Sequence, residues 1–451
     1  MNYGLRLLNF FSTFAHKTKK DMRKVLFFLF LICFQAAGNA QSAKTEIEKN
    51  VRLSAGGVLT YMVPRLQQSS SSGMKPFYIS HFGRSGSHYL DDATDYDYPY
   101  NTLRRAASLG KLTPMGQSIL ERVEAIRNDA QGRWGELTPS GHEQQKRIVR
   151  RMFERFPEVF ADDAHVDAKS TLSERCILSM ENALQELLVL NPRLQVTHSA
   201  SRHDLYYMAP DDSLLRRRAT EPSVMEPYQE FCQRHDSSDK LMKLLFNDAG
   251  YVKSEINAPR FNSFFFRLVS HLQNTELRKK MTLYDIFSDA DLYENWLRDN
   301  ARSYITYAAS PLNGGRQPFM ARELLRQIIY EADSIVSNRK TGVTLRFGHE
   351  STLLPLICLL DLNDYGQQIA DLNQVDRKGW RNYKMIPMAA NVQFVFYHRI
   401  PDDDEIYFKV LLNEDETSLP LKSSKAPYYR WSDFRERYLQ FLNSYQEGPQ
   451  P

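Results

Sequence analysis

An apolar, aromatic-rich run that ends in a Gly-Ser turn limits the folds open to this chain. Residues 76–84 are predicted to form a buried strand, and residues 83–87, with the sequence Gly-Arg-Ser-Gly-Ser, form the turn that ends it. Helical periodicity follows, and a strand followed by a helix is the pattern of an α/β unit. The chain has 451 residues, of which 42% are hydrophobic, so it can bury a sizeable core of this class.

The order of the remaining elements predicts a helical domain inserted into the α/β core. A strand over 194–199 is followed by residues 203–315, which are helical, polar and aromatic and lack strand alternation. We therefore expect a core built from residues 41–202 and 316–451, with 203–315 as an all-helical cap. The second part of the core is predicted to hold a helix from Pro318, a strand over 342–347, a helix from Thr352 and antiparallel strands over 391–397 and 405–412.

Two helices before the cap have recognisable starts. Ser140 and Glu143 have the spacing of a capping box, which predicts a helix of roughly four turns. A second helix opens at Ser173, carries Arg175 in its first turn and stops at the Asn-Pro pair of residues 191–192.

The first 40 residues are predicted to be an N-terminal extension and a secretory signal peptide. An apolar run over 25–34 follows two basic residues, and small residues at 36–40 favour cleavage after Ala40. The run is too short for a transmembrane helix, and no stretch of about 20 apolar residues occurs later. We expect an exported protein, periplasmic or extracellular, with no stable membrane insertion, whose translation starts at Met1 or Met22.

The net charge and the positions of the cysteines argue against a nucleic-acid partner and against a bound metal or other cofactor. The formal charge of +4 arises in residues 1–40, which hold six Lys or Arg and one Asp, so the rest of the chain is near neutral. We therefore expect no nucleic-acid partner. The arginines at 216–218 are predicted to be a solvated helix face or a local contact for an anion. The cysteines after residue 40 are widely separated and have no metal-ligand spacing, so neither a metal nor another cofactor is expected.

Four separated segments resemble the histidine acid phosphatases, the second branch of the histidine phosphatase superfamily. Their order and spacing are most similar to the multiple inositol polyphosphate phosphatases and phytases, across most of residues 50–420. The resemblance implies a histidine phosphatase fold, with a central mixed sheet flanked by helices, an inserted helical cap and a phosphate pocket where the two meet. The segments are Arg84 to Tyr89, Leu137-Thr138-Pro139-x-Gly141, Ser173-x-Arg175-Cys176-x-x-Ser179, and Phe347-Gly348-His349-Glu350-x-Thr352-Leu353-Leu354-Pro355-Leu356.

The resemblance also implies roles for individual residues. In that family a histidine attacks phosphorus, arginines hold the non-bridging oxygens and an acidic residue protonates the departing alkoxide. The family signature R-H-G-x-R aligns with residues 84–88. On this register Arg84 and Arg175 would bind phosphate, and His349 would donate a further hydrogen bond to the phosphoryl group.

Three positions depart from the family pattern. Ser85 stands at the nucleophile position, and His88 stands at the position of the second arginine. Family members read His-Asp or His-Ala-Glu, whereas His349 is followed directly by Glu350, the candidate proton donor. Because destroying a catalytic unit costs on the order of 10⁶ in rate, we expect the family-type activity to be weak or lost.

A rival register places the degenerate signature on residues 80–84. It keeps His81 as the nucleophile and Arg84 as its arginine, but it puts Phe82 where the family needs glycine. A phenylalanine side chain would obstruct a turn at which backbone must approach the phosphate. His81 is more consistent with a residue inside the strand.

Ser85 is the nucleophile in two further interpretations. Residues 83–87 nearly spell G-x-S-x-G, the nucleophile elbow of α/β-hydrolases, with His349 downstream. In the second interpretation, Ser85 forms a serine phosphoenzyme and His88 is its base. The remaining histidines near the aligned segments are predicted to be structural: His142, His198 and His203.

Two functional hypotheses follow from these observations. In the first, the chain is an exported phosphomonoesterase of the inositol phosphate or phytate type with a rearranged, slow site. In the second, it is a pseudophosphatase that uses Arg84, Arg175 and His349 to bind a phosphorylated ligand without turning it over. Both predict a phosphorylated small molecule, such as an inositol phosphate, as the partner, and neither predicts an oligomeric state.

Overall fold

A computed structural model gives the fold and describes residues 42–65, 73–338, 340–399 and 404–446. The predicted signal peptide and its cleavage position at Ala40 lie outside the described residues. No helix in the described part of the chain is long and apolar enough to span a membrane.

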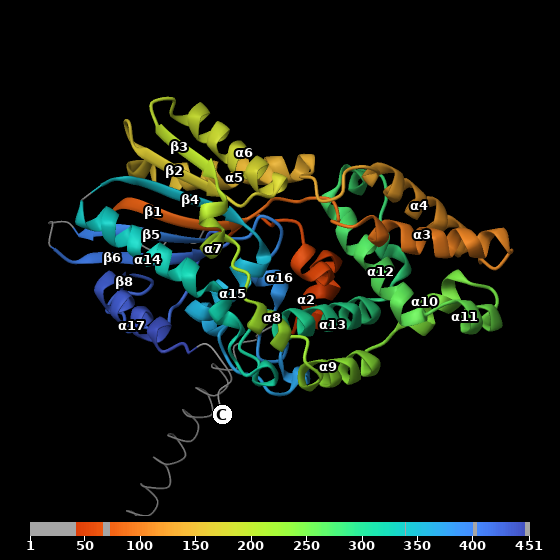
Figure 1. Cartoon of the computed structure of the whole chain (residues 1–451). Helices are drawn as coiled ribbons and strands as arrows, with labels where there is room; N and C mark the ends of the chain where they lie inside the picture. The colour runs from red at the N-terminus through yellow and green to blue at the C-terminus, as the bar shows by residue number, and fades with distance from the viewer. Residues whose placement is uncertain (1–41, 66–72, 339, 400–403, 447–451) are drawn as a thin grey trace, which may run out of the picture.

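An eight-stranded sheet forms one half of the molecule (Figure 1). The first four strands across it are mutually parallel, and the following strands are antiparallel to their neighbours, so the sheet is mixed, as predicted. In order across the sheet the strands are β3 (Gln195–Ala200), β2 (His165–Ser170), β4 (Gly342–Gly348), β1 (Met74–Arg84), β5 (Asn391–Arg399), β6 (Ile406–Leu412) and β7 (Asp415–Glu416), and β8 (Tyr429–Arg430) pairs with β6.

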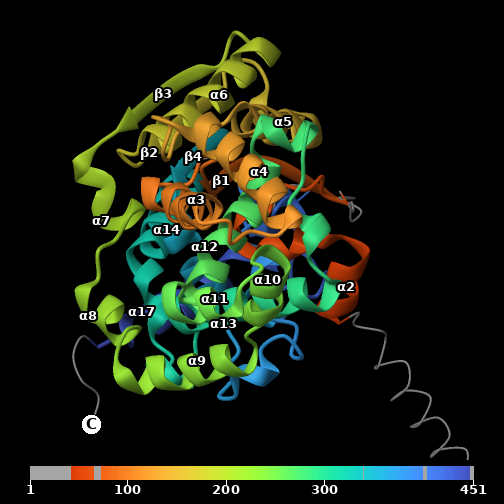
Figure 2. The same cartoon turned by 90° about the vertical axis from the view of Figure 1, so that its right-hand side faces the viewer.

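Helices cover both faces of this sheet (Figures 1 and 2). On one face, α5 (Pro139–Arg155) and α6 (Glu174–Leu190) bury a core with residues of β1, β2 and β4. On the other face, α14 (Arg322–Ser337), α15 (Glu350–Leu360) and α17 (Trp431–Asn443) pack on a second and larger core.

The remaining helices gather at one side of the sheet and form the second half of the molecule (Figure 1). The described chain between β3 and β4 forms only helices and the turns that connect them. Of these, α8 (Ser213–Arg218), α9 (Pro222–Arg234), α10 (Ser238–Leu245), α11 (Ala249–Glu255), α12 (Ala258–His271) and α13 (Asp289–Tyr307) lie in the second half, with short 3-10 turns between them. The short α7 (Leu205–Met208) contacts β4 and α14 on the sheet.

Two earlier helices pack with this group. The helices α3 (Ala93–Ser108) and α4 (Pro114–Ala130) contact α12 and α10, respectively. The N-terminal α2 (Ala43–Lys49) and the 3-10 turn η1 (Val51–Val58) contact α13. The cap boundaries at 203 and 315 remain a prediction, and the helical half extends beyond them.

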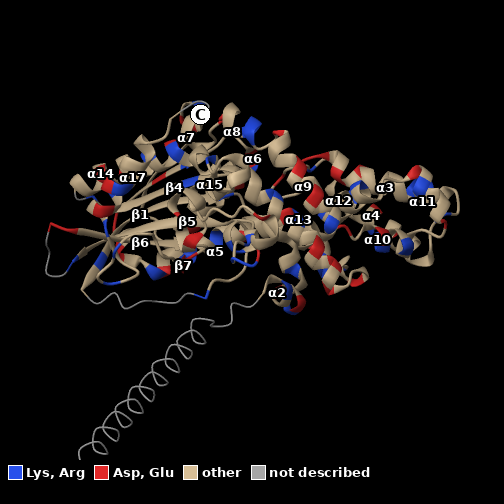
Figure 3. Cartoon of the chain, turned by 90° about the horizontal axis from the view of Figure 1, so that it is seen from below, with Lys and Arg blue, Asp and Glu red and all other residues tan. Residues whose placement is uncertain are grey.

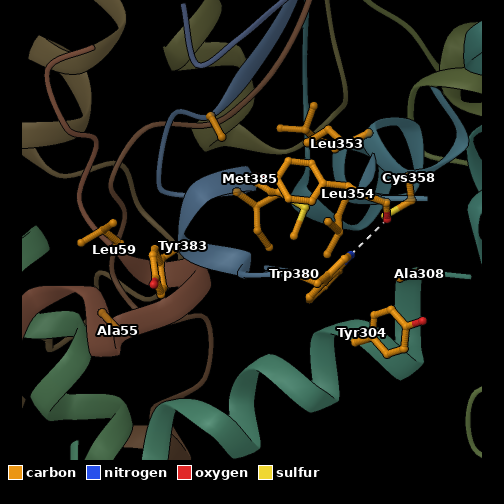
Figure 4. Packing of buried hydrophobic residues seen from close by; sticks show 14 of the residues in the cluster. Ala55, Leu59, Tyr304, Ala308, Leu353, Leu354, Cys358, Trp380, Tyr383 and Met385 are labelled. Atoms are coloured by element: carbon orange, nitrogen blue, oxygen red, sulfur yellow. Dashed lines mark hydrogen bonds between the residues drawn. The ribbon is translucent and has the colours of Figure 1, made fainter. Parts of the chain in front are cut away.

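Trp380 joins the two halves. Its ring lies 5.1 Å from the ring of Tyr304 on α13 and packs near Leu353 and Leu354 of α15 (Figure 4). Its indole N–H donates to the Tyr365 carbonyl at 3.1 Å, so this large buried side chain has its polar atom satisfied. The packing fixes the segment that follows Trp380 and leads back to the sheet.

Three local expectations need correction. The capping box at Ser140 is wrong, because α5 begins at Pro139 and the Thr138 hydroxyl accepts the Gly141 N–H. Proline is suited to the first helical position, which places the cap one residue before it. Helix α15 begins at Glu350 rather than Thr352. Strand β2, which no pattern predicted, is short and alternates polar with apolar residues.

Candidate functional site

The predicted site residues gather at the carboxyl end of the parallel strands. Arg84 ends β1 beside Gly348, which ends β4, and His349 follows as the N-cap of α15. Arg175 lies in the first turn of α6. Open α/β sheets bind ligands at this edge, since chain turns and helix N-termini meet there.

The loop after β1 is fixed by two of the other motif segments. The Ser85 N–H donates to the Gly348 carbonyl at 3.2 Å, and the Gly86 N–H donates to the Ser179 hydroxyl at 3.1 Å. Ser179 lies one turn after Arg175 on α6, so the same helix presents the arginine and holds the loop.

The segment at the start of α5 holds the loop from its other side. The Ser87 carbonyl accepts the Thr138 N–H at 2.9 Å and the Thr138 hydroxyl at 3.0 Å. The Ser87 hydroxyl is bonded to Asn274 at 2.7 Å and to Gln144 at 2.8 Å. The loop backbone and the Ser87 side chain are therefore held by hydrogen bonds within the core, which preorganises the residues that the loop presents.

Arg84 is buried and anchored by backbone. Its Nη1 donates to the carbonyls of Gly57 at 2.7 Å and Ile386 at 2.8 Å. Its Nη2 lies 3.2 Å from Glu350 Oε2. Its Nε is buried without a hydrogen-bond partner among the described residues. The Nη1 atom of the guanidinium thus has a structural role, whereas its Nε remains without a partner among the described residues.

Glu350 is held in its ionised form. Burial alone would raise the pKa of this carboxyl, but the Arg84 charge and the backbone N–H of Glu350 outweigh burial and lower the pKa to about 2. The Glu350 side chain is 41% exposed, whereas Arg84 behind it is 3% exposed. The site therefore opens to solvent at Glu350 and is deep at Arg84.

Arg175 is paired with a carboxylate that the sequence analysis did not single out. Asp91 Oδ1 lies 2.9 Å from Arg175 Nη1. A Cβ added to Gly135 would lie 2.9 Å from Asp91 Oδ1 and 3.3 Å from Arg175 Nη1, so the absence of a side chain there leaves room for the pair. The Arg175 Nε is buried and has no partner among the described residues.

His88 is a buried, neutral imidazole. Burial and the charges of Arg175 and Arg84 lower its pKa to about 3. Its Nδ1 lies 2.8 Å from the Tyr89 carbonyl, so Nδ1 carries the proton and Nε2 has the free lone pair. The backbone of His88 is held by the side chain of His271, whose Nε2 bonds the His88 carbonyl.

His349 is also neutral at physiological pH. Burial lowers its pKa, and the nearby Arg175 and Arg84 act in the same direction although Glu350 opposes them. Its Nε2 lies 3.3 Å from the Thr171 hydroxyl, and Cys176 Sγ lies 3.9 Å from its ring nitrogens. It can donate a hydrogen bond without adding charge to the site.

Ser85 lies at the first position after β1. Its carbonyl accepts the Ala389 N–H at 3.0 Å, and the residue is buried. Its hydroxyl has no hydrogen-bond partner among the described residues, since neither His88 nor His349 bonds to it. Among the described residues no basic side chain is hydrogen-bonded to this hydroxyl.

Other histidines lie elsewhere. His81 is buried inside β1, opposite Leu345 of β4, and its ring lies 5.4 Å from that of Phe347. Its ring packs against Gly83, where an added Cβ would lie 2.9 Å from His81 Nε2, so it remains buried in the sheet core. The others make local contacts: His142 with Asn182, His198 with Glu181 and His203 with Tyr206, while Arg216 of the basic cluster pairs with Asp211.

The charges of the site nearly cancel. Two arginines face two carboxylates, and both imidazoles are neutral. Along the helices in the view of Figure 3, Lys and Arg positions are interspersed with Asp and Glu positions. No group of three or more His, Cys, Asp and Glu side chains in the described ranges could hold a metal ion.

Comparison with known proteins gives a family match for most of the chain. The sequence model of the histidine phosphatase superfamily (branch 2) matches residues 90–413. Multiple inositol polyphosphate phosphatase 1 of Homo sapiens is 29% identical over 136 residues, a stretch that spans 27% of each chain. The Gallus gallus protein of the same name is 22% identical over 328 residues, covering 68% of this chain and 70% of its own length.

Solved structures share the fold. A Bifidobacterium longum multiple inositol polyphosphate phosphatase, in complex with inositol hexasulfate, aligns with a TM-score of 0.69 at 16% identity over 85% of this chain and 97% of that chain. The phytase from D. castellii aligns with a TM-score of 0.67 at 13% identity over 90% of this chain and 89% of that chain. These likenesses confirm the predicted α/β fold.

Proposed function

Because the chain belongs to branch 2 of the histidine phosphatase superfamily, we propose that it binds the phosphoryl group of a phosphorylated small molecule and turns it over weakly or not at all. An inositol phosphate is the ligand class that its relatives suggest. The single observation that carries this proposal is Ser85, which aligns with the nucleophilic histidine of the family motif on the register of residues 84–88 and whose hydroxyl is bonded to no base among the described residues.

Ser85 is a poor replacement for that histidine. A neutral imidazole attacks phosphorus directly, whereas a serine hydroxyl must lose its proton to a neighbouring base. Among the described residues neither imidazole of the site hydrogen-bonds to Ser85: His88 bonds its own loop backbone through Nδ1, and His349 bonds Thr171. Attack through position 85 is therefore disfavoured.

Proton donation is impaired as well. A leaving alkoxide needs an acid that holds its proton at the working pH. Glu350, at the candidate donor position, has its pKa lowered to about 2 and pairs with Arg84, so it is ionised at neutral pH. Both the attack on phosphorus and the protonation of the leaving alkoxide are then disfavoured.

Binding has better support than turnover. Arg84 and Arg175 each keep a buried, unpaired Nε, and His349 keeps an N–H donor. Arginine presents planar donors that match phosphate oxygens and remains charged at any working pH. We assign these three residues to the phosphoryl-binding site.

A slow phosphatase is the second candidate, and His88 favours it. Its imidazole is neutral, and its Nε2 is bonded to no partner among the described residues. The charges of Arg175 and Arg84 act on it. In this scheme Nε2 bonds to phosphorus as the ester P–O bond breaks, the alkoxide takes a proton from water, and a second water releases phosphate. Protein denatured at alkaline pH would then contain an alkali-stable, acid-labile phosphohistidine that His88→Gln removes.

Phosphate release separates the two candidates. The purified protein should release phosphate from phytate at a rate that is the same in wild type, Ser85→Ala and His88→Gln, which is the uncatalysed rate. Release that disappears only in His88→Gln would establish the slow phosphatase, and release that disappears only in Ser85→Ala would establish a serine nucleophile.

Export is part of the proposal. The N-terminal pattern at residues 22–40 supports removal of a signal peptide and a periplasmic or extracellular mature protein. Mass spectrometry of the protein from fractionated cells should find a new N-terminus at Gln41. An uncleaved chain in the cytosol would contradict export.

A further inference from the structure

The Asp91 carboxylate already occupies one of the two arginines assigned to phosphoryl binding. Its Oδ1 lies 2.9 Å from Arg175 Nη1, a distance at which a phosphate oxygen would otherwise bind. The Asp91 side chain is 60% exposed and that of Arg175 is 18% exposed, so the carboxylate is the more solvent-accessible partner of the pair. Gly135 packs against both and has a φ of 73°, which suits glycine.

The second arginine is paired in the same way with Glu350, at 3.2 Å. A phosphoryl dianion that enters the site therefore finds each of the two arginines already paired with a carboxylate. The buried Nε atoms of Arg84 and Arg175 have no hydrogen-bond partner among the described residues. A buried donor left unpaired is costly, so these atoms are the expected contacts of a ligand that displaces the carboxylates.

We infer that Asp91 is an internal competitor for the phosphoryl ligand at Arg175, and that it sets the affinity of the site. The inference rests on the proposed function, because it requires Arg175 to be a phosphoryl-binding residue. Asp91 differs from Glu350 in that it is more exposed and comes from the loop before α3, so it can swing into solvent without disturbing Arg84. Binding then exchanges one charge-assisted pair for another and yields little net free energy.

An opposite role for Asp91 predicts the opposite result. If Asp91 instead holds Arg175 in the correct orientation for the ligand, its removal would weaken binding, because a free arginine loses side-chain order. Asp91→Asn keeps the shape of the side chain and removes its charge, so it separates competition from positioning.

The experiment is a calorimetric titration of wild type, Asp91→Asn and Asp162→Asn with phytate and with inorganic phosphate. Asp162→Asn is the matched control, because Asp162 forms an exposed pair with Arg193 at 3.1 Å and has a positive φ that Asn tolerates. We expect Asp91→Asn to bind phytate about tenfold more tightly than wild type, with a larger gain at low salt, and Asp162→Asn to match wild type.

Unchanged or weaker binding by Asp91→Asn would overturn the inference. If wild type still bound phytate and Arg175→Ala lost that binding, the proposed function would survive that result. If neither wild type nor Asp91→Asn bound phytate or phosphate, both proposals would fail. Asp91→Ala, measured alongside with its thermal unfolding, excludes an effect specific to the asparagine side chain.

Discussion

Gly86 and Gly141 approach so closely that a Cβ added to Gly86 would lie 2.5 Å from the Gly141 carbonyl oxygen. The two glycines belong to different motif segments, and a Cβ on Gly141 would in turn lie 2.2 Å from the Ser87 carbonyl oxygen. Backbone presses on backbone here, so neither neighbour can yield by rotating a side chain. The glycines of these two motif segments thus permit one close backbone contact beneath the site.

Gly141→Ala should therefore destabilise the protein strongly. We expect a loss of about 2 to 4 kcal/mol in the free energy of unfolding, since overpacking against backbone forces the loop to move. Urea denaturation followed by circular dichroism measures it. Gly250→Ala, on α11, is the control and should be neutral or stabilising because alanine favours helix. Equal effects of the two substitutions would contradict the contact.

The double replacement Ser85→His, His88→Arg should restore activity selectively. It supplies the histidine and the arginine that the family motif has on the register of residues 84–88, but it leaves Glu350, whose pKa is about 2, without a proton to donate. General acid catalysis contributes about 10²- to 10⁴-fold, so p-nitrophenyl phosphate, whose leaving group needs no proton, should gain turnover and phytate should gain far less. Steady-state assays on both substrates check this. Equal gains on both would show that another acid serves the site.

The ion pair between Arg346 and Glu331 should matter for stability rather than for binding. Arg346 is fully buried in β4 and also donates to the Ser80 hydroxyl at 3.0 Å, while Glu331 reaches it from α14. Glu331→Gln leaves a buried charge without its counter-charge, which costs about 3 kcal/mol. Glu323→Gln, on the exposed side of the same helix, should cost less than about 0.5 kcal/mol. Chemical denaturation that finds equal costs would refute the role of the pair.

His81 should make the protein sensitive to acid. Burial and the Arg346 charge lower its pKa in the folded state to about 3, against a usual value of 6.5. Below pH 6.5 the unfolded chain binds a proton that the folded chain excludes, so stability falls by about 1.4 kcal/mol per pH unit until about pH 3. His81→Leu should lose less stability between pH 7.5 and pH 5 than wild type, by about 2 kcal/mol. The exposed His203→Gln should keep the wild-type difference, and a His81→Leu protein that also kept it would contradict the assignment.

The sequence was most informative where local chemistry decides structure. Residues 76–84 combine apolar and aromatic side chains with a glycine turn, and they form β1 with both faces buried, as predicted. The helix that carries Arg175 starts and stops near the predicted residues, because the Asn-Pro pair cannot extend it. Strand β2 escaped prediction because its residues His165, Asp167 and Lys169 alternate with apolar ones in a stretch too short to stand out.

The site itself could be predicted only in part. The four segments name Arg84, Arg175 and His349, and the structure brings these residues to one edge of the sheet. The pairing of Arg175 with Asp91 depends on how two distant loops meet, and nothing local to Asp91 signals it. The anchoring of Arg84 by the Gly57 and Ile386 carbonyls likewise depends on tertiary packing.

Titration of the purified protein with phytate, comparing wild type with Arg175→Ala, tests the central claim most directly. One charge-assisted contact is worth about 1.5 to 3 kcal/mol, so the account predicts saturable wild-type binding that weakens about 10- to 100-fold in Arg175→Ala. Arg193→Ala, which removes an exposed arginine outside the site, should bind as wild type does. Equal phytate affinity of wild type and Arg175→Ala would contradict the claim that this edge of the sheet is a phosphoryl-binding site.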